Sequence, residues 1–108
     1  MAAELSRLQS LSAVQAALDE FSRLGRTAFL LRYGFGKSRD FMVKNPANGK
    51  LCDSKAVVGA AYGVQSPDQG PLKPADFSGG EATVVPKLQS LGFEVFRIGK
   101  IFECRYHL

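Results

Sequence analysis

Two predicted helix starts carry groups that suit an anion. Ser54 and Lys55 open a segment rich in Ala and Val, where a capping serine leaves the lysine free to reach a phosphate. The helix dipole favours an anion there by about 0.3–1 kcal/mol. Residues 78–80 are Ser-Gly-Gly, and glycines let a phosphate approach bare backbone N–H groups at a second helix start. The alternatives are a plain N-cap beside an exposed lysine, and glycines that only permit packing against Phe77.

A basic loop precedes the first predicted strand. Lys37, Ser38 and Arg39 follow a Gly-Phe-Gly sequence and suit a clamp on DNA phosphates, the alternative being a tight turn with solvated charges. A P-loop would need a glycine at the position of Leu31 and a helix after the loop, so ATP binding is not expected.

Other side chains suit contact with bases or with the flank of a duplex. Thr83 and Lys87 are four residues apart on one predicted helix, and the Thr83 methyl group suits the methyl of thymine or 5-methylcytosine. Tyr33 offers an aromatic face to a flipped or modified base. The predicted DNA-binding residues are Tyr33, Lys37, Ser38, Arg39, Ser54, Lys55, Ser78, Gly79, Gly80, Thr83, Lys87 and Lys100.

Catalytic and metal chemistry receive little support. His107 is the single histidine, and Cys52 and Cys104 have no partners at the spacing of a zinc site. No carboxylate stands at a familiar catalytic distance along the chain from a histidine or lysine. We therefore expect a non-catalytic domain with no metal and no cofactor, and a small hydrolase is the weakest alternative.

Positive charge concentrates in residues 22–55. The whole chain of 108 residues has a net charge of +4, but this segment holds eight basic residues against Asp40 and Asp53. It therefore carries +6, which favours a surface that faces a polyanion. The alternative is a basic face without a partner, which many small domains have.

Apolar spacing predicts the N-terminal helices. A helix is expected from about Ala13 to Leu24, with Ser12 and Gln15 as a capping box and Gly25 after its end. Residues 1–11 form either a helical extension or a frayed tail. A short helical turn is expected over 28–33, with Thr27 as its cap and Gly34 as its stop.

The middle of the chain predicts a hairpin and a helix. Residues 40–44 and 50–52 would be strands joined by a turn at Asn48 and Gly49. The Ala- and Val-rich helix would then run over 54–62, stop at Gly63 and be buried on most sides. Three prolines favour irregular backbone as far as residue 76.

The C-terminal part predicts a second helix and a second hairpin. Ser78 and Glu81 have capping-box spacing, and Gly92 lies just beyond the expected helix end. Pro86 either falls in the first turn of a helix that begins near Thr83, or kinks a longer helix. Residues 93–98 and 101–106 alternate as two strands around a turn at 99–100.

This order of elements predicts a single α+β domain over 1–108. The order helix–hairpin–helix–helix–hairpin is that of a winged-helix-like fold, with a recognition helix and a β-ribbon wing that carries Lys100. The alternative is a generic small α+β domain whose second hairpin only covers the core.

The chain resembles the N-terminal head domain of McrA-type (ScoMcrA-like) modification-dependent HNH restriction endonucleases from actinobacteria. The likeness runs from about Val14 to Val95 and depends on YGFGKSR at 33–39, DSKAVVGAAYG at 53–63, GPL at 70–72, DFSGGEATV at 76–84 and LGFEV at 91–95. An HNH site needs two histidines, so the nuclease module of that family is absent from this chain. Pro86 also departs from the family pattern.

The resemblance and the residues together predict a double-stranded DNA-binding module. The resemblance implies a place in a modification-dependent restriction system, recognition of modified cytosine, and an HNH nuclease module in cis or in trans. The alternative is a protein-interaction or dimerisation module that positions a nuclease without touching DNA. No apolar run is long enough to span a membrane and no signal peptide is evident, so a cytoplasmic location is expected.

Overall fold

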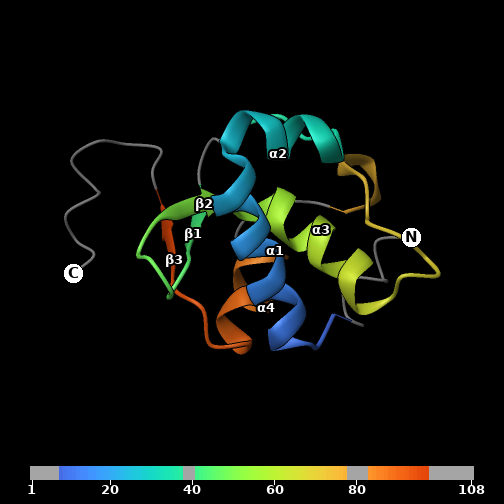
Figure 1. Ribbon diagram of the computed structural model, residues 1–108. Helices are drawn as coiled ribbons and strands as arrows, with labels where there is room; N and C mark the ends of the chain where they lie inside the picture. The colour runs from blue at the N-terminus through green and yellow to red at the C-terminus, as the bar shows by residue number, and fades with distance from the viewer. Residues whose placement is uncertain (1–7, 38–40, 78–82, 98–108) are drawn as a thin grey trace.

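The computed structural model describes residues 8–37, 41–77 and 83–97 of the chain. In these residues four α-helices, one 3-10 helix and three strands form an α+β fold (Figure 1). In chain order the elements are α1 (Leu11–Leu24), α2 (Arg26–Tyr33), β1 (Phe41–Lys44), β2 (Leu51–Asp53), α3 (Ser54–Gln65), η2 (Pro74–Asp76), α4 (Val84–Ser90) and β3 (Val95–Arg97).

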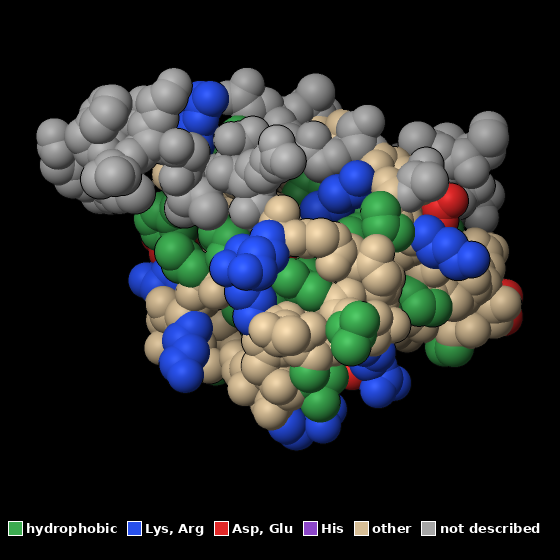
Figure 2. Space-filling view, turned by 90° about the horizontal axis from the view of Figure 1, so that it is seen from above, with side chains coloured by type: hydrophobic (Ala, Val, Ile, Leu, Met, Phe, Trp, Pro, Cys, Tyr) green, Lys and Arg blue, Asp and Glu red, His purple; other side chains and the backbone are tan. Residues whose placement is uncertain are grey.

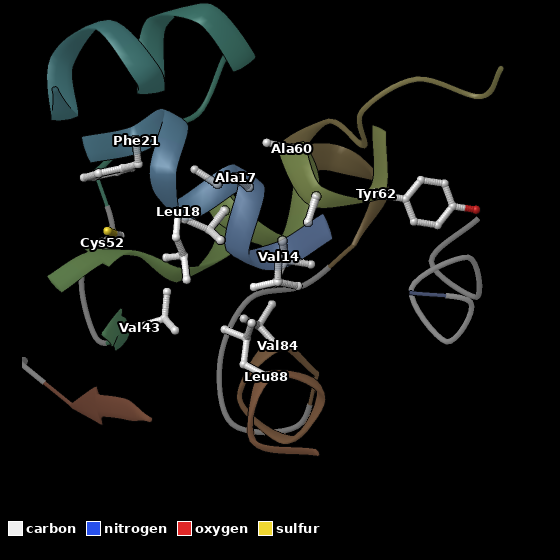
Figure 3. Close-up of a cluster of buried hydrophobic side chains, with 14 of the residues drawn as sticks. Val14, Ala17, Leu18, Phe21, Val43, Cys52, Ala60, Tyr62, Val84 and Leu88 are labelled. Carbon is white, nitrogen blue, oxygen red and sulfur yellow. The ribbon is translucent and has the colours of Figure 1, made fainter. Parts of the chain in front are cut away.

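The packing of α1 against α3 forms the centre of the molecule. Val14, Leu18 and Phe21 on α1 are buried with Val57 and Ala61 on α3, and side chains from the sheet and from α4 complete the cluster (Figure 3). The helix α2 lies across one end of this pair, and α4 lies beneath α1 at the other end (Figure 1). The two short helices therefore occupy opposite ends of the domain.

The sheet has strand order β2-β1-β3, and both pairs are antiparallel. The predicted first hairpin is confirmed, and Gly49 takes the positive φ of 76° that its turn requires. Asn45 before this turn is fully buried, and its side chain accepts a hydrogen bond from Gln15 and donates one to Ser22 on α1. The hairpin is thus fixed to α1 through polar contacts.

The third strand joins the first hairpin. Val95 of β3 lies opposite Val43 of β1, whose other neighbour is Cys52. The strand predicted over 93–98 is confirmed at Val95–Arg97, while the partner predicted over 101–106, with its turn at 99–100, lies outside the described residues. The structure therefore confirms an α+β fold with an antiparallel sheet but not the winged-helix arrangement.

The starts of α1 and α2 differ from the prediction. Ser10, rather than Ser12, caps α1, and its hydroxyl accepts a hydrogen bond from the Ala13 amide at 3.0 Å. The helix α2 begins at Arg26 directly after Gly25, so Thr27 lies inside the helix and is not its cap. The predicted stop at Gly34 is confirmed by its left-handed backbone.

The predicted end of α3 at Gly63 is wrong, because α3 continues to Gln65. A Cβ atom at Gly63 would stand 2.8 Å from the Pro71 nitrogen, and one at Gly59 would stand 2.8 Å from the Leu72 carbonyl oxygen. These two glycines lie one turn apart and let the 70–72 segment run directly against the helix. Their role is to allow this segment to pack closely against α3.

The first of the two resolutions for Pro86 is confirmed. The helix α4 begins at Val84 after Thr83, which places Pro86 in the first turn, where a missing N–H costs no helical hydrogen bond. The predicted capping box at residues 78–81 lies outside the described residues. Within the described part of the chain, no helix is long and apolar enough to cross a membrane.

Candidate nucleic-acid interface

The helix α2 has two sharply different faces. Phe29 and Leu30 are buried, with Tyr33 half-buried one turn later on the same side. The opposite side is exposed to solvent over its whole length and consists of Thr27, Ala28, Leu31 and Arg32. Leu31 is 80% exposed, the largest value among the exposed large hydrophobic side chains of the described residues. An apolar side chain therefore stands fully outward on a helix that also carries cations.

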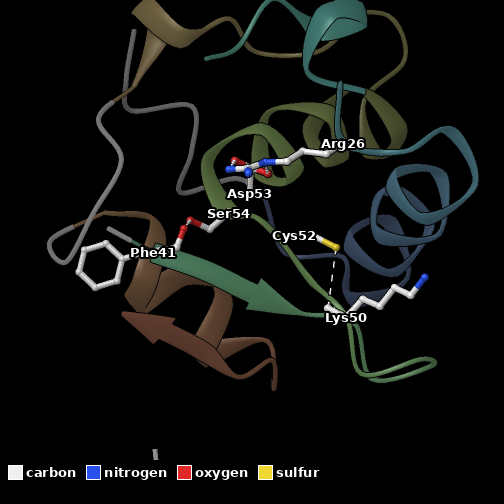
Figure 4. Close-up of polar contacts among 6 residues, drawn as sticks. All are labelled: Arg26, Phe41, Lys50, Cys52, Asp53 and Ser54. Carbon is white, nitrogen blue, oxygen red and sulfur yellow. Dashed lines mark hydrogen bonds and ion pairs between the residues drawn. The ribbon is translucent and has the colours of Figure 1, made fainter. Parts of the chain in front are cut away.

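An internal ion pair fixes the start of α2. The Arg26 guanidinium donates to both carboxylate oxygens of Asp53, each at 2.8 Å, and Asp53 is fully buried between β2 and α3 (Figure 4). The hydrogen bond to Asp53 raises the pKa of Arg26. The pair cancels one cation and one of the two acidic residues of the basic segment, so the positive charge at the surface comes from the other basic residues.

Tyr33 is held by contacts within the protein. Its hydroxyl donates a hydrogen bond to Glu20 at 2.7 Å, and its ring centroid lies 4.8 Å from that of Phe29. The Arg32 guanidinium lies over the Tyr33 ring, 5.6 Å from its centroid. Burial and the bond to Glu20 raise the pKa of Tyr33. The predicted base platform is therefore a half-buried ring that orients α2 on α1.

The loop between α2 and β1 packs on the first turns of α3. The Phe35 ring lies 6.2 Å from the Phe77 ring and packs on Gly59 of α3, which brings the loop before Lys37 onto the first turns of that helix. Lys55 lies one turn before Gly59, and its ammonium group stands 5.1 Å from the centre of the Phe77 ring. Its Nζ donates to the Pro74 carbonyl at 2.9 Å, so the charge is positioned by η2 without being neutralised by a carboxylate among the described residues.

Ser54 has a structural position. It is 3% exposed, and its hydroxyl donates to the Phe41 carbonyl at 2.9 Å, which ties the start of α3 to β1 (Figure 4). Asp53 is the N-cap of α3 but makes no capping hydrogen bond through its side chain, because its carboxylate faces Arg26. The side chains of Asp53 and Ser54 at the predicted helix start are therefore both engaged within the protein.

The helix α4 lies at the end of the domain opposite α2, and it contacts α3, the helix that carries Lys55. Thr83 is its N-cap residue without a side-chain capping bond, and Lys87 is half-buried and takes part in an interaction within the protein. Figure 1 shows α4 beneath α1, at the end opposite α2. The predicted recognition pair therefore lies on a different element from Lys37 and Lys55. The other predicted site residues lie outside the described residues: Ser38, Arg39, Ser78, Gly79, Gly80 and Lys100.

The face that includes α2 is basic. Figure 2 shows Lys and Arg side chains spread over it, with apolar side chains between them and few Asp or Glu side chains. Arg23 and Lys37, which flank α2 in sequence, are exposed and form no ion pair with any other described residue. The prediction omitted Thr27, Ala28 and Leu31. The apolar spacing of Phe29, Leu30 and Tyr33 turns them outward, and that signal was present in the sequence.

The described residues include one buried thiol and no cluster of metal ligands. Burial raises the pKa of the Cys52 thiol to about 12, with the nearby charge of Asp53 as the second cause, so the thiolate nucleophile is suppressed. No group of three or more His, Cys, Asp or Glu side chains in the described segments could hold a metal ion. What the surface offers is exposed positive charge.

Comparison with known proteins identifies the family. The model of the ScoMcrA-like N-terminal head domain matches residues 7–97, and the chain therefore belongs to this family of restriction-system domains. No curated protein and no solved structure matches the chain. The predicted resemblance is confirmed, and the match spans every helix and strand described above.

Proposed function

We propose that this domain binds double-stranded DNA as the non-catalytic recognition part of a modification-dependent restriction system. The family supports the restriction role. The observation that carries DNA binding is the positive charge on the face that includes α2, where Arg23 and Lys37 are exposed and have no carboxylate partner among the described residues. Surface cations without carboxylate partners release counterions when they neutralise phosphates, and this release drives binding.

The placement of the paired cations supports this proposal. Arg32 and Lys44 have carboxylate partners at 3.4 Å, Glu20 and Glu94 respectively. Exposed pairs of this kind contribute little to stability and can be exchanged for phosphate contacts at small cost. Arg26 is different, because its partner Asp53 is buried and its task is internal. The DNA-facing charge is therefore assigned to Arg23, Lys37 and Lys55, with Arg32 as an adjacent contributor.

A salt titration of DNA binding tests the proposal. Fluorescence anisotropy with a short unmodified duplex at several salt concentrations should show affinity falling with a log–log slope of about −0.9 for each phosphate neutralised. Three contacts would give a slope near −2.7 by the same rule. Failure to bind the duplex at low salt contradicts the proposal.

The kind of DNA that is read belongs to the same proposal. A cytosine-methylated duplex of identical sequence should bind more tightly than the unmodified one if the domain senses the modification. Equal affinities would keep DNA binding and remove modification sensing from this domain. The proposed nuclease partner is an HNH module in cis or in trans, and the proposed setting is the cytoplasm. The proposed contact set includes Ser38, Arg39, Ser78, Gly79, Gly80 and Lys100, whose contribution alanine variants in the same assay would measure.

The second candidate function is a protein-interaction module that positions a nuclease. The exposure of Leu31 favours it, because an outward apolar side chain suits a protein contact. Sedimentation without DNA separates the two functions. A dimer that is insensitive to salt, together with no duplex binding, would favour the protein-interaction reading.

A further inference from the structure

We infer that α2, and not α4, is the helix that lies against the duplex, with its outer face in the major groove. This inference rests on the proposed DNA-binding function and names the element that performs it. The outer face consists of Thr27, Ala28, Leu31 and Arg32, all exposed. The major groove is about 12 Å wide and admits one α-helix. The eight residues of α2 form a helix about 12 Å long.

The side chains of this face suit a methyl-bearing groove. Alanine and the methyl group of threonine make the apolar contacts with which proteins recognise the 5-methyl group of thymine, and Leu31 adds a larger apolar surface one turn beyond Thr27. These residues are small or flexible, so the helix can approach the base edges closely. Because a 5-methylcytosine places its methyl group at the same position in the groove, the same face would touch that modification too.

Cations stand on both sides of the apolar strip. Arg23 lies in the last turn of α1 before α2, and Lys37 follows the left-handed end of α2 at Gly34, and both are exposed. Arg32 lies on the outer face itself, with a side chain that is 61% exposed. An apolar strip between cations matches a groove floor between two phosphate backbones.

The same face fits a protein partner less well. Leu31 is the only large apolar side chain on the outer face of α2, and the other exposed large hydrophobics of the described residues lie on other elements, at Leu11, Leu51 and Val64. A stable protein interface buries about 800 Å² on each partner around a cluster of apolar anchors. A single leucine among cations does not supply such a cluster.

The helix α4 lacks these features. It has seven residues, its exposed positions are Pro86, Gln89 and Ser90, and Lys87 is half-buried with a contact inside the protein. At the exposed position in its first turn, α4 carries the rigid ring of Pro86, which has no polar group to offer a base or a phosphate. The exposed positions of α4 therefore include no cation and no strip of small apolar side chains that could contact a methyl group in the groove.

A pair of matched double variants tests the assignment. Ala28→Asp with Leu31→Asp adds two carboxylates to the outer face of α2, and Gln89→Asp with Ser90→Asp adds two to the exposed surface of α4. All four positions are exposed, so both proteins should fold, which thermal melting and far-UV circular dichroism would verify. In the anisotropy assay the α2 variant should bind duplex DNA at least about tenfold more weakly, and the α4 variant within about twofold of wild type.

Milder variants keep the test independent of added charge. Leu31→Ser should weaken binding about threefold or more, while Leu51→Ser, at another exposed leucine, should leave it unchanged. If wild type binds and the α4 variant loses affinity while the α2 variant keeps it, the assignment to α2 is overturned and DNA binding stands. If wild type fails to bind any duplex, the proposed function itself fails.

Discussion

The helices α2 and α4 are both short and both end in a turn, yet they expose different side chains. The helix α2 buries Phe29 and Leu30, and the Arg26–Asp53 ion pair fixes its start. Its exposed side carries Thr27, Ala28, Leu31 and Arg32. The helix α4 buries Val84 and Leu88, and its exposed positions are Pro86, Gln89 and Ser90. Both helices bury one side and expose the other, but of the two only α2 exposes a cation and a large apolar side chain. The chemistry of the exposed side, rather than the start signals of each helix, distinguishes the two.

The largest expected effect tests how α2 is anchored. Arg26→Met would leave the buried Asp53 carboxylate without its bidentate partner, and breaking a buried pair in this way costs about 3 kcal/mol. The matched variant Arg32→Met removes an exposed arginine from the same helix and should cost less than about 1 kcal/mol. Urea unfolding measures both. Equal losses of free energy of unfolding would mean that the internal ion pair does not hold α2.

The second effect tests the packing that joins the basic loop to α3. Gly59→Ala places a methyl group 2.8 Å from the Leu72 carbonyl and 2.7 Å from the Phe35 ring, and Gly63→Ala meets Pro71 at 2.8 Å. Each should destabilise by about 1–3 kcal/mol, although alanine favours a helix over glycine by about 1 kcal/mol. The control Val64→Ala, on the same helix and 46% exposed, should stay within about 0.5 kcal/mol of wild type. Increased stability of either glycine variant would contradict the packing role.

A smaller effect tests the two cationic regions against each other. Lys37→Ala should weaken duplex binding about threefold on any sequence and reduce the salt slope by about 0.9, because one phosphate contact is lost. Lys44→Ala removes a cation that pairs with Glu94 near the α4–β3 turn, and it should leave both quantities unchanged. The reverse result would move the DNA to the sheet side of the domain.

The smallest effect at neutral pH concerns the buried thiol. In a Cys104→Ser background, Cys52 should not react with a thiol reagent in the native state below pH 9.0 and should react once the protein is unfolded. Since the native pKa is about 12 and lies above the unfolded value of 9.0, the unfolded state loses its proton first as pH rises. Stability should therefore fall between pH 9.0 and about 12. Rapid native labelling would show that this side of the fold opens readily.

Much of the fold follows from local sequence signals. The apolar repeat of α1 and the Asn48-Gly49 turn both gave correct elements, because each depends on residues close together in the chain. The sequence left two positions open for Pro86, and the structure places it in the first turn of α4. The α3 boundary failed for a different reason. Glycine marks a helix end in one context and a close helix contact in another, and only the position of Pro71 and Leu72 in space distinguishes the two at Gly63 and Gly59.

The candidate site was harder to predict than the fold. Ser54 and Lys55 look alike in sequence as helix-start residues, but the Ser54 hydroxyl is buried and donates to the Phe41 carbonyl, whereas the half-buried Lys55 donates to the Pro74 carbonyl beside Phe77. Whether a polar side chain is free depends on partners that are distant in sequence. Leu31 illustrates the converse, because the apolar spacing of Phe29, Leu30 and Tyr33 already indicates that it points outward, and the prediction did not use that signal.

The most direct test is an NMR titration of the ¹⁵N-labelled domain with duplex DNA. Amide shifts should be largest at Thr27, Ala28, Leu31 and Lys37, smaller at Lys55, and small on α4. Shifts concentrated at residues 84–90 with α2 unaffected would contradict the account, and so would the absence of shifts at low salt.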